Sequence, residues 1–275
     1  MKTKTIILGM LLFGAAGVVQ AQTDEDLGNE FGARLSVQVD KKLAKGLHVY
    51  GDEEIRFRND FKSLGRFHTT LGVTYKVIPG VKVGFGYALI NRCDTATGSF
   101  KFPRHRLMLD ATGTMRYGDW SFSLKERLQG TIRTGSFNEY QARRMVLELK
   151  SRVKVAYKGF GRVEPYLSGE LRSTLNAPAI NANYDGTYYL TDAYVRTGEA
   201  GWFIGSWTSW YVNRLRATVG VDWRIDRRNS LGAAVMADWT TDYVVDANST
   251  GTRLKSYTKE TGFKGWLTVG YKLAL

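Results

Sequence analysis

Residues 47–58 read LHVYGDEEIRFR, a stretch in which apolar and polar side chains alternate with a period of two. One face of the extended chain is mainly apolar and the other is polar or charged: Leu47, Val49, Ile55 and Phe57 against His48, Tyr50, Asp52, Glu54, Arg56 and Arg58. In a β-strand, successive side chains point to opposite sides. The pattern therefore predicts a strand whose two faces contact two different environments.

The same alternation recurs through most of the chain. It is clear in residues 66–77, 104–117 and 144–158, and it continues to the end of the sequence. Turn signals separate the stretches, with short turns at 44–46, 79–80, 118–119, 159–161 and 226–229 and long loops at 59–65, 91–101, 134–140, 176–209 and 246–255. This order predicts an antiparallel meander. Because no linker divides it, we expect one domain over residues 22–275, with a long loop insertion at 176–209.

The first 21 residues have the features of a secretory signal peptide. Lys2 and Lys4 precede an apolar run from Ile6 to Val19, and residues 19–21 read VQA, a pattern that signal peptidase recognises. The run is shorter than the ~20 residues that a membrane-spanning helix needs, and no later apolar stretch reaches that length. We therefore predict cleavage after Ala21 and export of residues 22–275 without a helical anchor.

Alternating strands suit both a soluble β-sandwich, which would bury the apolar face in its core, and a membrane barrel. Several predicted strands reach about twelve residues, whereas soluble strands usually have about five or six. Aromatic residues lie near strand ends on the apolar face, as in the girdles of outer-membrane barrels: Tyr75, Tyr87, Tyr117, Trp120, Tyr157, Trp223, Trp239, Tyr243 and Tyr271. Together with the export signal, these features predict an all-β, antiparallel, up-and-down transmembrane β-barrel in the outer membrane of a Gram-negative bacterium.

The number of strands follows from the segments and from a rule of barrel construction. About eleven alternating segments can be distinguished, but single-chain bacterial barrels usually have an even number of strands. Either one segment is not in the wall, or a further strand near residues 187–195, inside the long loop, brings the total to twelve. We therefore expect about ten to twelve strands and favour twelve.

The polar faces of the predicted strands are rich in charge. The chain has 39 Lys and Arg against 26 Asp and Glu, a formal net charge of +13. The basic residues alternate with apolar ones and are interleaved with acids, so they do not form the basic stripe typical of nucleic-acid binding. In a barrel they would face the lumen as an ion-pair network made of Asp52, Glu54, Arg56, Arg58, Arg104, Arg106, Asp110, Arg127, Glu148, Lys150, Arg152, Glu170, Arg172, Arg214, Arg216, Asp222 and Arg224. A path that prefers anions is the second interpretation, because basic residues are in excess.

Two acids break the pattern, since Glu53 and Glu126 fall in register with lipid-facing residues. A carboxylate in the hydrocarbon band is unfavourable. We therefore expect a β-bulge, an interfacial depth or a protein partner at each of them.

A resemblance to a known family rests on several strand motifs. These are EEIRFR (53–58), RFHTTLGVTYKVIPGVKVGFGYALI (66–90), RHRLMLDATGT (104–114), WSFSLKERLQ (120–129) and VEPYLSGELRSTLN (163–176). In these segments the chain resembles the domain-of-unknown-function 2490 family. The resemblance implies a bacterial outer-membrane barrel and implies no activity, because the family offers no catalytic residues to carry over. Residues 176–209, rich in Tyr, Trp and Gly, depart from the pattern.

Catalytic chemistry has little support in the sequence. The three histidines, His48, His68 and His105, belong to no recognisable serine-containing motif. Metal-ligand spacing and phosphate-binding loops are not found, so we predict no metal and no cofactor. The single Cys93 excludes an internal disulfide framework.

We therefore predict a non-enzymatic outer-membrane protein: a structural barrel, a narrow anion-preferring pore or transport accessory, or a surface-binding protein. The alternative is an outer-membrane enzyme, a lipid or peptide hydrolase or acyltransferase, with its active site at the rim. The expected partners are outer-membrane lipid and the outer-membrane assembly machinery, which would recognise the apolar face of the last strand.

The barrel prediction has a direct test in solution. The purified chain should require detergent, give a β-dominated circular dichroism spectrum and migrate differently on gels before and after boiling, because a closed barrel resists unfolding by detergent. A monomer that stays soluble without detergent would contradict it.

Overall fold

The computed structural model describes residues 23–94, 97–138, 141–178, 180–182, 188–190, 208–249 and 254–275. The signal peptide predicted at residues 1–21 lies outside them. Within the described part of the chain, no helix is long and apolar enough to cross a membrane.

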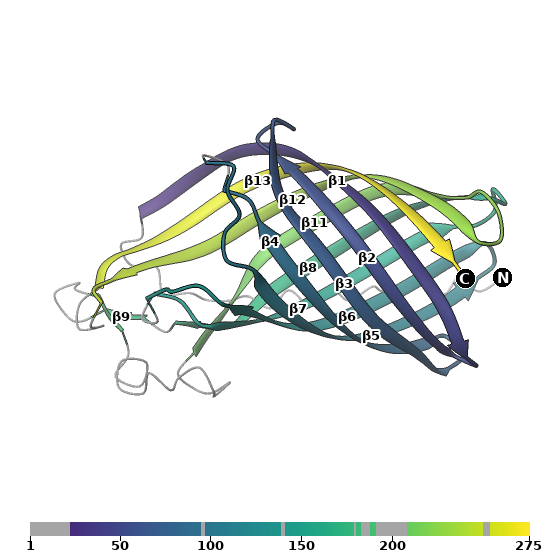
Figure 1. Ribbon diagram of the computed structural model, residues 1–275, viewed down its shortest axis with the longest axis horizontal. Coiled ribbons are helices and arrows are strands. Elements are labelled where there is room, and N and C mark those ends of the chain that lie inside the picture. The colour runs from purple at the N-terminus through teal and green to yellow at the C-terminus, as the bar shows by residue number, and fades with distance from the viewer. Residues whose placement is uncertain are drawn as a thin grey trace, which may run out of the picture.

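Eleven strands of the described chain form one closed barrel, drawn as a tilted cylinder in Figure 1. The wall strands are β1 (Thr23–Ala44), β2 (Leu47–Arg58), β3 (Ser63–Ile78), β4 (Val81–Arg92), β5 (Arg104–Tyr117), β6 (Trp120–Arg133), β7 (Met145–Tyr157), β8 (Val163–Pro178), β11 (Thr208–Arg224), β12 (Asn229–Ala247) and β13 (Leu254–Ala274). Their order around the wall is β1-β13-β12-β11-β8-β7-β6-β5-β4-β3-β2. The strands have 12 to 22 residues, more than the ~9–11 that cross a bilayer.

The turn pattern is confirmed. The five predicted short turns join β1 to β2, β3 to β4, β5 to β6, β7 to β8 and β11 to β12, and we call their side of the barrel the short-turn end. The opposite side is the long-loop end. One long loop is shorter than predicted, since only residues 59–62 separate β2 from β3. Asn59, Asp60 and Phe61 all have left-handed backbone (φ 51°, 53° and 69°), which reverses the chain abruptly.

Eleven strands lie within the predicted range, but the favoured number of twelve is wrong. Residues 188–190, inside the segment expected to supply a twelfth strand, form β10 (Tyr188–Leu190), which pairs with β9 (Ile180–Ala182) in a separate two-stranded sheet. With an odd number of strands in a meander, the first and last run in the same direction. The closing pair of β1 and β13, which we call the seam, is accordingly parallel, whereas the other wall pairs are antiparallel as predicted.

Aromatic rings packed against glycines fix the register of the seam. Phe31 of β1 is the partner of Gly265, and Gly32 is the partner of Trp266 of β13. A Cβ atom on Gly32 would lie 2.7 Å from the Trp266 ring, and one on Gly265 would lie 2.5 Å from the Phe31 ring. Because each ring occupies the space that a side chain would need, these partners must be glycines.

The two faces of the wall differ as the alternation predicts. In β3, Leu71 is 61% exposed and His68 only 7%, and in β5 Leu109 is 56% exposed while Met108 is 4% exposed. Aromatic pairs lie at two levels of the wall: Trp120, the first residue of β6, packs on Tyr157 with ring centroids 5.0 Å apart, and Trp239, in the middle of β12, packs on Phe263 at 5.5 Å. The outer surface is therefore an apolar band that carries aromatic pairs, as in outer-membrane barrels.

The two outward glutamates differ. Glu126 accepts a hydrogen bond from Ser151 Oγ at 2.6 Å, so its expected protein partner is confirmed. Glu53 lies between Val37 and Thr69 in regular register, with no bulge, and no residue in the described ranges forms a hydrogen bond or ion pair with it. For Glu53, an interfacial depth or a partner from another chain stays a prediction.

The parallel seam can be tested by disulfide formation. Ser36 of β1 and Gly270 of β13 are register partners, so Ser36→Cys with Gly270→Cys, in a Cys93→Ser background, should cross-link on oxidation and change migration on non-reducing gels. Ser230 lies one strand farther away, on β12. Because two strand spacings are about 9–10 Å and a disulfide tolerates about 7 Å between Cα atoms, Ser36→Cys with Ser230→Cys should stay reduced. Cross-linking of the control pair alone would contradict the register.

Candidate functional site

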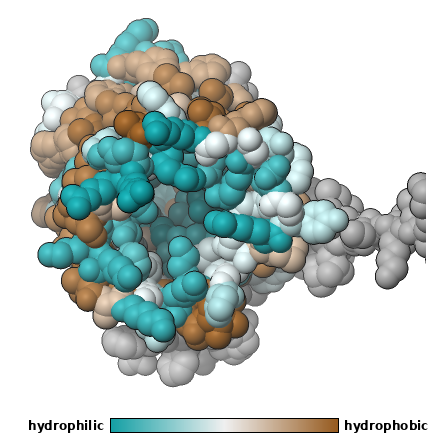
Figure 2. Space-filling view, turned by 90° about the vertical axis from the view of Figure 1, so that its right-hand side faces the viewer, coloured by the Kyte–Doolittle hydropathy of each residue, from teal (hydrophilic) through white to brown (hydrophobic). Residues whose placement is uncertain are grey.

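The lumen gathers most of the charged side chains. Figure 2 looks onto the short-turn end and shows hydrophilic residues around a hollow centre, with hydrophobic residues on the periphery. The strand register gives the same division between a charged inner face and an apolar outer face. Asp110 of β5 is directly opposite Arg127 of β6, which is opposite Lys150 of β7. The inward positions therefore form continuous rows of charge around the wall.

Glu148 is the centre of a buried cluster. Its carboxylate accepts hydrogen bonds from Gln129 and from Asn213 Nδ2 (3.2 Å), and it forms an ion pair with Arg172 Nε at 3.2 Å. Asn213 also accepts from Arg172 (2.6 Å) and donates to Thr174 Oγ1 (2.6 Å). Gln129 is 1% exposed, Asn213 3% and Glu148 7%. This cluster connects β6, β7, β8 and β11 through the barrel interior.

A β-bulge makes the Glu148 cluster possible. The register of β11 on β8 shifts between Val212 and Arg214. Asn213 is the additional residue, so both Asn213 and Arg214 reach the interior, where they are 3% and 8% exposed. A regular strand would have turned one of them outward.

A second cluster runs from the seam along the neighbouring strands β12, β11 and β8. Arg216 binds Asp238 through two hydrogen bonds of 2.5 and 2.6 Å, and Arg34 of β1 reaches the same carboxylate at 3.5 Å. The Arg34 guanidinium also lies 4.2 Å from the centre of the Trp266 ring, a cation–π contact. Arg214 pairs with Glu170, which lies 3.9 Å from Arg216. Ion pairs therefore run along the inner wall from β1 through β12 and β11 to β8.

A third cluster surrounds a small internal cavity. Asp110 accepts two hydrogen bonds from Arg127 (2.6 and 2.7 Å) and lies 2.8 Å from Lys125 Nζ. The cavity, of about 100 Å³, is lined by Lys125, Arg127, Lys150, Arg152 and Glu170. Four of these five side chains are basic, so this part of the lumen has an excess of positive charge.

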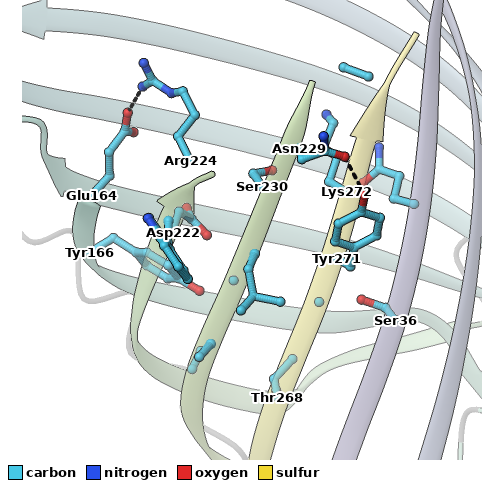
Figure 3. Close-up of a pocket in the computed structure, with 18 of the residues that line it drawn as sticks. Ser36, Glu164, Tyr166, Asp222, Arg224, Asn229, Ser230, Thr268, Tyr271 and Lys272 are labelled. Atoms are coloured by element: carbon cyan, nitrogen blue, oxygen red, sulfur yellow. Dashed lines mark hydrogen bonds and ion pairs between the residues drawn. The ribbon is translucent and has the colours of Figure 1, made fainter. Parts of the chain in front are cut away.

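The short-turn end opens into a vestibule of about 710 Å³, shown in Figure 3. Glu164 pairs there with Arg224 and with Lys158 (2.7 Å), and Asp222 pairs with Lys154 at 2.8 Å. In the turn that borders the vestibule, hydrogen bonds from the Asn229 side chain and from backbone N–H groups lower the pKa of Asp226. The vestibule is polar and ion-paired along its rim.

At the long-loop end, charge pairing is less complete. Glu30 binds Arg58 Nε at 2.7 Å and Lys264 at 3.2 Å, and Glu54 pairs with Arg56. A second pocket, of about 590 Å³, lies where β4, β5 and β6 end, and the arginines Arg92, Arg104 and Arg133 line it. Within the described ranges, none of these three arginines has an acid within ion-pair distance.

Twelve of the seventeen residues predicted for the network form ion pairs in the structure: Glu54, Arg56, Arg58, Asp110, Arg127, Glu148, Glu170, Arg172, Arg214, Arg216, Asp222 and Arg224. The other five have no ion-pair partner in the described part of the chain: Asp52, Arg104, Arg106, Lys150 and Arg152. Arg106 instead donates to Thr131 Oγ1 at 2.9 Å.

Several residues that form hydrogen bonds or ion pairs in the lumen clusters were not among the predicted residues. Arg34 and Asp238 both lie at positions on the polar face of an alternating strand. Their place in the alternation therefore predicts that they face the lumen. Gln129 is uncharged, so the charge pattern of the sequence does not single it out. Asn213 was hidden because its bulge interrupts the period of two.

The histidines show no catalytic arrangement. His48 pairs with Asp40 at 2.8 Å, His105 contacts the Tyr87 hydroxyl at 2.6 Å on the outer face, and His68 is buried. In the described ranges, no serine hydroxyl is hydrogen-bonded to any of them. The same residues contain no group of three or more His, Cys, Asp or Glu that could hold a metal ion.

Comparisons with known proteins give one family and a set of distantly similar solved structures. Outer-membrane expressed OmpT of Vibrio cholerae has 9% identity and a TM-score of 0.34, covering 78% of this chain and 61% of that one. The anion-selective porin from Comamonas acidovorans has 11% identity and a TM-score of 0.33, covering 82% and 53%. The chain thus spans less than two thirds of either structure, and the search of curated proteins finds no match. The family model described as "Protein of unknown function (DUF2490)" matches residues 31–246, and the chain belongs to that family.

Proposed function

We propose that the chain is a non-enzymatic outer-membrane barrel whose lumen is closed by ion pairs, and that it acts as a structural or surface-binding protein rather than as a diffusion pore. The proposal includes export to the outer membrane of a Gram-negative bacterium. In that setting the short turns would face the periplasm and the long loops the exterior. Outer-membrane lipid would cover the apolar band, and the assembly machinery would receive β13.

The observation that carries this proposal is the lining of the lumen by the buried Glu148 and Asp238 clusters, which tie neighbouring strands together along the inner wall. Eleven strands about 4.8 Å apart and tilted by about 40° close at a radius of ~11 Å. An extended arginine reaches about 7 Å from its Cα atom, given ordinary bond lengths. Extended arginines on facing walls therefore leave only roughly 8 Å between their ends, so the lumen is narrow, and the buried state of Gln129, Asn213 and Asp238 supports a largely filled inner wall.

A narrow path for small anions is the second candidate. It is favoured by the internal cavity, where Lys125, Arg127, Lys150 and Arg152 face the single acid Glu170. Fixed positive charge in a confined passage attracts anions and repels cations, because screening there is weak. The rim enzyme is the least supported candidate, since His48 and His105 contact an aspartate and a tyrosine rather than a serine.

Conductance separates the first two candidates. In planar lipid bilayers, a closed lumen should give no steady current. An anion path should give a small current whose reversal potential favours chloride over potassium, and Arg104→Ser with Arg106→Ser should reduce that preference. A large, steady, cation-selective conductance would contradict both.

The closed-lumen proposal also predicts a stability difference between buried and vestibular pairs. Glu148→Ala leaves Arg172 without its buried acid, so it should lower the free energy of unfolding by about 3 kcal/mol. Asp222→Ala is the matched control, because its side chain is 45% exposed and such pairs contribute about 1 kcal/mol or less. Urea unfolding in lipid vesicles, followed by tryptophan fluorescence, measures both. Equal losses for the two variants would show that the Glu148 cluster is not a buried bridge.

A further inference from the structure

The pocket at the ends of β4, β5 and β6 has a composition unlike the rest of the lumen. We call it the rim pocket. Its volume is about 590 Å³, and it is lined by three arginines, Arg92, Arg104 and Arg133, and by aromatic rings from the adjoining loops. None of the described residues that line it is acidic. Elsewhere in the interior, at Glu148, Glu170 and Asp238, arginines have carboxylate partners.

The arginines are held close to one another by strand pairing. Arg104 of β5 is the cross-strand partner of Arg133 of β6, and Arg92 of β4 is the partner of Arg66 of β3. Like charges directly opposite each other are destabilising, and arginine does not lose its proton in proteins. The Arg133 Nε atom is buried without a hydrogen-bond partner. The rim pocket therefore has donors and positive charge that the described chain does not satisfy.

The aromatic part of the pocket is exposed and locally supported. Phe100 and Phe102 are 61% and 71% exposed. Phe102 packs against Gly135, where a Cβ atom would lie 2.9 Å from its ring. The two loops are joined by a hydrogen bond from Thr134 Oγ1 to the Pro103 carbonyl at 2.5 Å. Apolar rings are thus held beside the guanidinium groups.

We propose that the rim pocket binds an amphipathic oxyanion, a molecule with a phosphate or carboxylate group joined to an aromatic or aliphatic part. Guanidinium groups bind such oxyanions through paired hydrogen bonds, and the rings of Phe100, Phe102 and Phe137 provide the apolar surface. A ligand with both parts fits the pocket better than a simple ion or a neutral apolar molecule. The proposal does not depend on whether the lumen is open.

Phenyl phosphate is a suitable probe because it is soluble and carries both parts. Isothermal titration of the full-length protein in neutral detergent should show saturable binding, tighter than for inorganic phosphate or benzyl alcohol. Arg104→Gln with Arg133→Gln should weaken binding at least about tenfold, since two charge-assisted hydrogen bonds are lost. Phe102→Ala should reduce the preference for phenyl phosphate over inorganic phosphate while leaving phosphate binding in place.

Arg116→Gln is the matched control, because Arg116 lies on the same strand β5 at the short-turn end. It should bind phenyl phosphate like the unchanged protein. Heat-modifiable migration verifies that each variant is folded. No binding, or binding that is insensitive to the Arg104 and Arg133 substitutions, would overturn the proposal. Displacement by lysophosphatidic acid in the micelle would identify a lipid headgroup as the source of the anion, and displacement only by water-soluble aromatic phosphates would identify a solute.

Discussion

The closure of an odd number of strands by a parallel pair is the constraint on which the rest of the structure depends. In lipid, each backbone N–H and C=O of the wall needs a partner, so an open edge is not tolerated. The seam meets this need through the partners from Phe31↔Gly265 to Asp40↔Ala274. A slip of one residue would move rings onto positions that carry side chains and would exchange the inner and outer faces. The pairing of each ring with a glycine therefore sets both closure and charge placement.

Closure at this narrow diameter then decides the character of the lumen. Charged side chains on neighbouring strands lie within reach of one another, and burial favours their pairing. Aromatic side chains fill part of the remaining space by lying over glycines, as Tyr50 does on Gly72 and Tyr166 on Gly220. Arg34 connects the seam with the charged lumen, because it extends from the seam strand β1, stacks on Trp266 and reaches Asp238.

The sequence predicts the features that depend on local alternation. The bounds of β2 and β5 agree with those expected, because an apolar outer face and a polar inner face leave a period of two in the residues themselves. The number of wall strands was harder to predict from the sequence, because residues 188–190 form a strand that pairs with β9 and is not part of the wall. At the site, the inward charges were predictable, whereas their partners depend on the barrel diameter, on the bulge at Asn213 and on contacts such as Arg34 with Asp238 between segments far apart in the chain.

The arginines of the lumen differ along the barrel axis in whether a carboxylate pairs with them. In the middle, Arg172, Arg214 and Arg216 each contact a carboxylate. At the long-loop end, Arg56, Arg66 and Arg92 are successive cross-strand partners, as are Arg104 and Arg133, and only Arg56 among these five has an ion pair within the described ranges. In the middle, the cross-strand row of Arg127, Lys150, Arg172 and Arg214 is also basic, but nearby acids pair with three of its four members. A wall selected only for stability would place acids in the same way beside the arginines of the long-loop end. The unbalanced arginines therefore favour a role for this end of the barrel that involves a molecule from outside the chain.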